Sequence, residues 1–240
     1  MLLRSALVAT MTLGCVSQGF YTSPRTLAPG RLQHGGYVEF VARGGDRGPV
    51  GVFPVPIVGY TARYGLSRGI EGGARINVLG TLGLDVKLQL VRSRGFDLAL
   101  DPLVVSSWTV GNVHLPLIAG FNLSPRVQVL LGARFSYGVE LLAGTGVISS
   151  ANPCDPSGTD LAVRDIALCG ASAGALLGLR LVVGDLALQP EYSVSRAIEG
   201  SSGTLVHTLA LALSLAPLPD FGPEPPATPE ATRWTPTPPR

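Results

Sequence analysis

The sequence has little charge and no long apolar run. Only 14% of its 240 residues are charged, and the mean hydropathy is +0.35. Soluble domains carry about 25% charged residues, so this chain is unusually apolar. No uninterrupted stretch reaches the roughly 18 apolar residues that a membrane-spanning helix requires. An ordinary soluble domain and a membrane protein built from helices are therefore both disfavoured.

The low net charge and the few histidines and cysteines exclude further classes of function. The net charge is only +2 and Lys87 is the single lysine, so there is no electrostatic case for nucleic acid as a partner. The three histidines and three cysteines form no cluster with metal-ligand spacing. We therefore expect neither a metal nor another cofactor. The 31 glycines disfavour long helices.

Apolar side chains recur at every second position through most of the chain. Between residues 126 and 141, apolar side chains at odd positions alternate with small, polar or charged ones, and Leu130 is the one exception. Successive side chains of a strand point to opposite faces, so such a segment is a strand with one apolar and one polar face. A soluble sandwich also alternates. Here Arg134 and Glu140 lie on the second face and many segments share the pattern, which favours a β-barrel in a membrane.

Ten segments carry this alternation. They are residues 31–43, 56–65, 69–79, 83–92, 95–107, 111–122, 126–142, 171–183, 185–195 and 203–215. The sequence predicts an all-β fold, a closed antiparallel up-and-down transmembrane β-barrel over residues 31–216. Ten strands are the first expectation and eight the next.

Most connections between these segments alternate in length, although those after residues 69–79 and 95–107 are both short. Short ones contain Leu66 to Arg68, Ser93-Arg94, Leu123 to Pro125 and Gly184-Asp185, whereas residues 44–53, 143–170 and 197–203 make longer ones. Barrels of bacterial outer membranes have short periplasmic turns and longer outer loops. We therefore expect both termini to be periplasmic.

The polar faces of the predicted strands carry nearly balanced charges. The expected lumen charges are Glu39, Arg43, Arg63, Glu71, Arg75, Asp85, Lys87, Asp97, Asp101, Arg134, Glu140, Arg180, Asp185 and Glu191. Ions confined in so narrow a space must pair, because an unpaired buried ion costs several kcal/mol. We expect a lumen closed by salt bridges, with a narrow conduit or small-ligand site among the charges as the alternative.

The remaining segments have no strand period. Residues 1–15 have one positive charge, an apolar stretch and small residues, as in an export signal. Residues 16–30 are expected to be a tether, and the Pro/Thr-rich residues 217–240 a disordered tail. Cys154 and Cys169 flank the longest connection, and in an exported protein such a pair predicts a disulfide that closes an outer loop.

The chain resembles small outer-membrane β-barrel proteins of the lipoprotein type from Gram-negative bacteria. The resemblance is carried by the lipobox-like ending Thr12-Leu13-Gly14-Cys15, by TSPRTLAPGRLQ, and by the turns in TARYGLSRGIEGGARI and LDVKLQLVRSRGFDLALD. It implies lipidation of Cys15, although the lipobox usually has Leu where this chain has Thr12. It also implies the bacterial outer membrane, with membrane lipid and the barrel insertion machinery as partners. The expected aromatic end of the last strand is missing, since residues 214–216 read SLA.

Several functions remain open at this stage. The first is a non-enzymatic barrel with a structural or surface-interaction role, whose surface ligand the sequence does not name. The second is a narrow channel or transporter for small solutes. The third is a hydrolase at the rim, for which His114 and Asp101 are the conceivable pair, although nothing marks a nucleophile. The fourth is a soluble lipid-binding barrel, which requires an apolar interior and a polar exterior.

Lipidation of Cys15 can be tested directly. In the Cys15→Ser variant we expect a mature protein without the mass of the acyl chains and with altered processing, because the serine offers no thiol to acylate. Mass spectrometry of the membrane fraction measures both. An unchanged mass and cleavage site would contradict lipidation.

Overall fold

The computed structural model describes residues 19–44, 55–106, 110–140, 170–198 and 205–215. The strands are β1 Leu32–Gly44, β2 Val55–Ser67, β3 Ile70–Asn77, β4 Leu82–Arg92, β5 Phe96–Leu100, β6 Leu103–Ser106, β7 Val110–Ser124, β8 Val127–Glu140, β9 Gly170–Val183, β10 Leu186–Ala197 and β11 Leu205–Leu215. They lie close to the segments expected from alternation. No helix within these ranges is long and apolar enough to cross a membrane.

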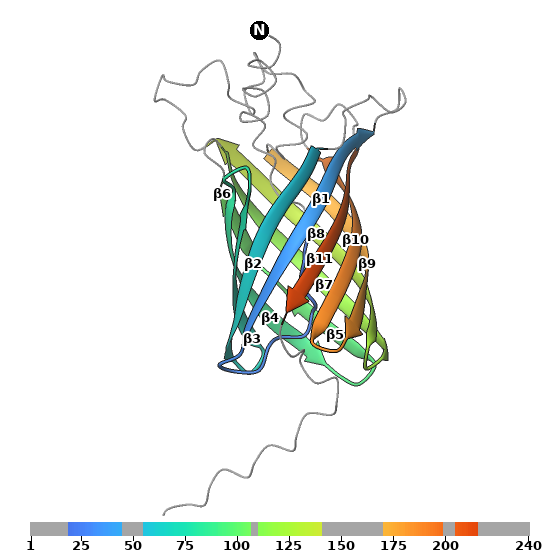
Figure 1. Ribbon diagram of the computed structural model, residues 1–240. Helices are drawn as coiled ribbons and strands as arrows, with labels where there is room; N and C mark the ends of the chain where they lie inside the picture. Colours follow the sequence, from blue (N-terminus) through green and yellow to red (C-terminus); the bar gives the residue numbers. More distant parts are fainter. Residues whose placement is uncertain (1–18, 45–54, 107–109, 141–169, 199–204, 216–240) are drawn as a thin grey trace, which may run out of the picture.

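The strands form a closed antiparallel ring (Figure 1). Consecutive strands pair with each other except β5 and β6, and β1 pairs with β11 to join the two ends of the sheet. β5 and β6 share one position in the ring, since both lie between β4 and β7. Pro102, which has no N–H to donate, separates them. The ring therefore has ten positions, and the expected ten-stranded up-and-down barrel is confirmed.

The wall is apolar outside and polar inside. On the outer face Leu84, Leu131 and Leu211 are 59%, 44% and 45% exposed, whereas Lys87 and Arg134 are 1% and 7% exposed and point inward. A soluble lipid-binding barrel requires the opposite arrangement, so that alternative is wrong. An apolar exterior around a polar interior is the architecture of an outer-membrane-type β-barrel.

Polar side chains on the outer face pair with one another. The hydroxyl of Tyr192 and Nδ1 of His207 lie 2.7 Å apart, and the ring of His34 contacts the hydroxyl of Tyr60 in the same way. A polar group facing hydrocarbon is costly unless it forms a hydrogen bond. The pairing explains how two histidines are accommodated on this face.

The two ends of the barrel differ. The connections after β2, β4, β7 and β9 are tight, and Gly69 and Gly184 adopt positive φ values of 76° and 60° in two of these turns. We call this the short-turn end; it is the lower end in Figure 1. At the other end, more residues separate β1 from β2, β8 from β9 and β10 from β11 in the sequence.

Several expectations fall outside the described residues. These are the export signal at 1–15 with Cys15, the cysteines Cys154 and Cys169, and the tail at 217–240. They stay predictions.

The outer face should tolerate charge only near its edges. Leu211 lies in the middle of β11, and Leu123 lies at the short-turn end of β7 and is 69% exposed. An arginine facing lipid costs about 2–4 kcal/mol at the bilayer midplane and about 0–1 kcal/mol near the interface. Leu211→Arg should therefore lower the free energy of unfolding in lipid vesicles by about 2–4 kcal/mol, as measured by urea titration. Leu123→Arg is the matched control. Equal costs for the two variants would contradict the assigned depth of these positions.

Candidate functional site

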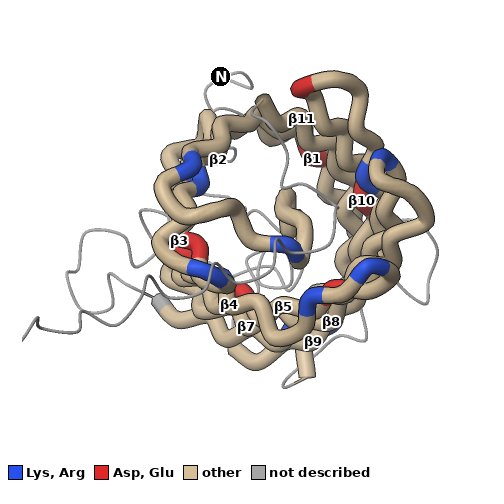
Figure 2. Tube along the Cα trace, turned by 90° about the horizontal axis from the view of Figure 1, so that it is seen from below, with Lys and Arg blue, Asp and Glu red and all other residues tan. Residues whose placement is uncertain are grey.

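The lumen contains part of the chain itself. Residues 19–27, which precede β1, are all buried, and the view along the barrel axis shows this stretch inside the ring of strands (Figure 2). We call residues 19–28 the lumen segment. The expectation of a tether at 16–30 is therefore wrong for residues 19–27, which are bound by the inner wall along their length.

An ion pair fixes the lumen segment near the short-turn end. Arg25 Nη2 lies 3.1 Å from Asp97 Oδ1, and both side chains are almost fully buried. Arg25 Nη2 also donates to the carbonyl oxygen of Ser93 in the β4–β5 turn at 3.0 Å. The hydroxyl of the next residue, Thr26, donates to Gln89 Oε1 at 2.8 Å. The guanidinium thus joins this part of the segment to both β5 and the neighbouring turn.

Lys87 and Glu71 bind the middle of the lumen segment. The ammonium group of Lys87, the single lysine of the chain, donates to Thr22 Oγ1 at 2.8 Å and to the carbonyl oxygen of Ser23 at 2.9 Å. Glu71 Oε2 accepts the backbone N–H of Leu27 at 2.7 Å. Extended chain inside a lumen has no ladder partner of its own, so these side chains satisfy backbone groups that would otherwise be buried without a hydrogen bond.

Two carboxylates from other strands hold the first residues of the segment. Glu191 on β10 accepts hydrogen bonds from the backbone N–H groups of Phe20 and Tyr21, each at 2.9 Å. Glu39 on β1 accepts the N–H of Gly19 at 3.3 Å and the hydroxyl of Tyr21. The segment is therefore bound from opposite parts of the ring.

Apolar and aromatic contacts complete the binding. Phe20 packs in the lumen against Ile118, Leu130 and Leu176, all of them buried. Leu130 is the residue that broke the polar pattern of β8, and its contact with Phe20 explains the exception. The ring of Tyr21 stacks on Tyr37 with centroids 4.0 Å apart.

The inner wall has a compact ion network beside the segment. Arg63 is at its centre and contacts Glu71, Asp85 and Asp101, the last at 3.4 Å. Lys87 Nζ lies 2.8 Å from Glu71, and Arg75 Nη2 lies 3.9 Å from Asp85. Three cations thus face three carboxylates. Removing one member of a buried ion pair costs about 3–5 kcal/mol because its partner is left uncompensated.

The structure places most of the expected lumen charges on the inner face. Those buried there are Glu39, Arg63, Glu71, Arg75, Asp85, Lys87, Asp97, Asp101, Arg134, Arg180 and Glu191. The side chains of Arg43 and Glu140 are outside the description. Asp185 is exposed, so its expected position in the lumen is wrong. β9 ends at Val183 and the chain turns at Gly184, which puts Asp185 in the turn rather than on the wall.

His114 and Asp101, the conceivable hydrolase pair, belong to different groups. His114 Nδ1 lies 2.7 Å from Ser136 Oγ on the neighbouring β8, and the histidine is fully buried. Asp101 instead faces Arg63. Within the described ranges, no group of three or more His, Cys, Asp or Glu residues is placed to hold a metal ion.

Two glycines make room for the lumen segment. A Cβ on Gly65 would lie 2.1 Å from the carbonyl oxygen of Ala28, and one on Gly120 would lie 2.6 Å from Pro24 Cγ. Both are on the inner face, where a side chain would occupy the space of the segment. Sequence reasoning missed the segment because it has no period. The signals that could have revealed it are Leu130, which interrupts the polar face of β8, and these two glycines of the inner face.

Comparison with known proteins adds no assignment. No family model and no curated protein matches the chain. Among solved structures, Neisserial surface protein A is 12% identical with a TM-score of 0.35, over 77% of this chain and 96% of that one. The NanC porin is 8% identical with a TM-score of 0.40, over 75% and 98%. The outer membrane protease OmpT from Escherichia coli is 8% identical with a TM-score of 0.39, over 81% and 100%. At these values the likenesses assign neither a family nor an activity.

Gly65→Ala should disturb the lumen segment selectively. The added methyl group would clash with the backbone at Ala28, and overpacking of this kind costs about 1–3 kcal/mol. We expect a lower free energy of unfolding in urea and faster tryptic cleavage after Arg25 in the folded protein. Gly36→Ala is the control, because a Cβ there meets only the carbonyl oxygen of Gly59 at 3.6 Å. Cleavage at equal rates in the two variants would contradict the close approach.

Proposed function

We propose that this protein is a non-enzymatic barrel of the bacterial outer membrane whose lumen is closed by its own N-terminal segment. Its role in this proposal is structural or in surface interaction. The observation that carries the proposal is the binding of residues 19–27 by side chains from β1, β3, β4, β5 and β10. The segment and the ion network occupy the space through which a solute would pass.

The outer membrane is proposed as the location because the outer face presents an apolar belt to its surroundings. Tyr64 and Phe121 are 46% and 41% exposed on this face near the short-turn end, where aromatic rings suit the membrane interface. We propose that the short-turn end faces the periplasm, as in other bacterial barrels. β1 begins and β11 ends at the short-turn end. Membrane lipid and the barrel insertion machinery are the partners that this location requires.

The surface-interaction role rests on the long connections at the other end. Loops carry binding while a rigid scaffold holds them. The connection between β8 and β9 is the longest, and a disulfide between Cys154 and Cys169 would lower its conformational freedom. We propose this loop as the recognition element.

Catalysis is not part of the proposal. His114 and Asp101 are held in separate groups, and the histidine is enclosed by the wall rather than open to a substrate at the rim. A general base has to reach the proton that it abstracts.

A channel that opens when the lumen segment leaves is the second candidate. It is favoured by buried polar atoms of the inner wall that have no hydrogen-bond partner among the residues the structure describes, such as His114 Nε2, Ser193 Oγ and Thr208 Oγ1. Such groups are suited to a lumen that admits water.

Conductance separates the two candidates. In planar lipid bilayers the full chain should insert without producing a steady conductance, because the lumen segment fills the inner wall. Replacement of residues 19–28 by a flexible Gly/Ser linker of equal length should give measurable channels if the segment alone closes the lumen.

Steady conductance of the unaltered protein would contradict the closed barrel. Silence of a folded linker variant would show that wall side chains close the lumen by themselves, and would reject the gated channel. Heat-modifiable gel mobility establishes that each protein is folded before it is measured.

A further inference from the structure

The outer face of the barrel has a groove over β1–β4. Its volume is about 390 Å³, and the residues that line it include Leu32, Ala62, Tyr64, Gly72, Ala74 and Leu84. Ala62 and Ala74 are paired across β2 and β3, and Gly72 is paired with Tyr64. These small residues leave a hollow in a belt of larger side chains. Leu32, Tyr64 and Leu84 form its apolar sides.

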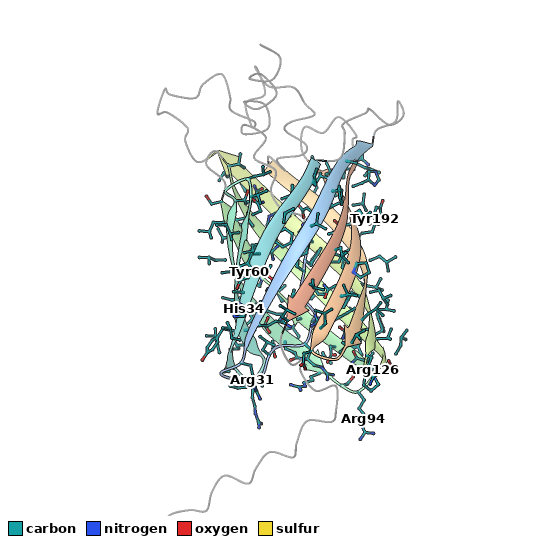
Figure 3. All side chains as sticks on the ribbon, viewed as in Figure 1. Arg31, His34, Tyr60, Arg94, Arg126 and Tyr192 are labelled. Carbon is teal, nitrogen blue, oxygen red and sulfur yellow. The ribbon has the colours of Figure 1, made fainter. Side chains whose placement is uncertain are left out.

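Arginines surround the short-turn end beneath this groove. Arg31, Arg68, Arg92, Arg94 and Arg126 are all exposed in or beside the turns there. Figure 3 shows Arg31, Arg94 and Arg126 at the lower end of the barrel, and Figure 2 shows basic residues along the near rim. Of the acidic side chains whose burial the structure describes, Asp185 alone is exposed. The short-turn end is therefore basic.

Arg31 connects the groove with this basic rim. It precedes Leu32, which lines the groove, and its carbonyl oxygen accepts the N–H of Gly65 at 2.9 Å. This hydrogen bond fixes the backbone of Arg31 beside the short-turn end of β2. Its guanidinium group lies just beyond the apolar belt, at the depth where lipid headgroups begin (Figure 3).

A second groove provides an internal comparison. It lies on the outer face of β8–β11, has a volume of about 380 Å³, and is lined by residues that include Leu177, Pro190 and Leu209. The turn between β9 and β10 carries the exposed Asp185. The two grooves are similar in size and apolar character. At the short-turn end of the second groove the exposed Arg126 is accompanied by the exposed Asp185, whereas the described exposed charges beside the first groove are arginines.

We propose that the groove over β1–β4 binds one anionic glycerophospholipid. An acyl chain fills the hollow at Ala62, Gly72 and Ala74, and the phosphate accepts hydrogen bonds from Arg31. Arginine suits this role because its planar guanidinium group can donate two parallel hydrogen bonds to a phosphate. The proposal is independent of whether the lumen conducts.

Native mass spectrometry of the full chain in detergent tests the proposal, with phosphatidylglycerol and phosphatidylcholine as probes. We expect the wild-type protein to retain phosphatidylglycerol about tenfold more tightly than phosphatidylcholine. Ala74→Leu fills the groove and should reduce retention of both lipids. Arg31→Gln should remove the preference for phosphatidylglycerol while leaving the groove intact.

Matched changes elsewhere serve as controls. Ala133→Leu adds the same volume to the exposed outer face of β8, and Arg196→Gln removes an exposed arginine near the other end. Both controls should bind phosphatidylglycerol as the wild type does, and gel mobility should show all four variants folded.

Equal retention of the two phospholipids by the wild type, or an unchanged preference in Arg31→Gln, would overturn the proposal. The same holds if Ala133→Leu weakens binding as much as Ala74→Leu does. Displacement of phosphatidylglycerol by equimolar lipid A would assign the site to a different lipid and would likewise overturn it.

Discussion

Charge compensation inside the lumen is the constraint on which the rest of the structure depends. A barrel with an apolar exterior has to direct its ionisable side chains inward, and each must find a counter-charge or a hydrogen bond there. Arg63, Glu71, Asp85, Asp101, Lys87 and Arg75 do so as three cations and three carboxylates. Two further carboxylates bind the lumen segment, because Asp97 pairs with Arg25 and Glu191 accepts hydrogen bonds from two backbone N–H groups. Wall and segment together form one compensated system.

The two-residue period predicted the wall well. It gave the ten positions of the ring, the face on which each side chain lies, and therefore the inward position of most lumen charges, because side-chain direction in a strand follows directly from sequence parity. The single error among the described charges, Asp185, arose at a boundary. Extending the inward, odd-numbered positions of β10 back from Ala187 puts Asp185 in the lumen, whereas β10 begins at Leu186 and Asp185 lies in the turn after Gly184.

The lumen segment could not be predicted in the same way. Its structure follows from tertiary contacts with strands as distant in sequence as β10, and it has no ladder of its own to impose a period on its side chains. The sequence does show the effect of the lumen segment on the wall residues that contact it. Leu130 is apolar where polar residues are the rule, and Gly65 and Gly120 leave space where side chains are expected. Departures from alternation were therefore more informative about the site than alternation itself.

The pairing of β1 with β11 determines the order in which this molecule can assemble. These are the first and last strands of the wall, so the sheet remains an open, curved surface until the whole barrel sequence is available. While the sheet is open, the carboxylates of β1, β3, β5 and β10 are accessible. Residues 19–27 can then bind to them before the barrel closes. Once the barrel has closed, the same residues can enter or leave only along its axis. Enclosure of the segment is thus a step of biogenesis as much as a feature of the finished protein.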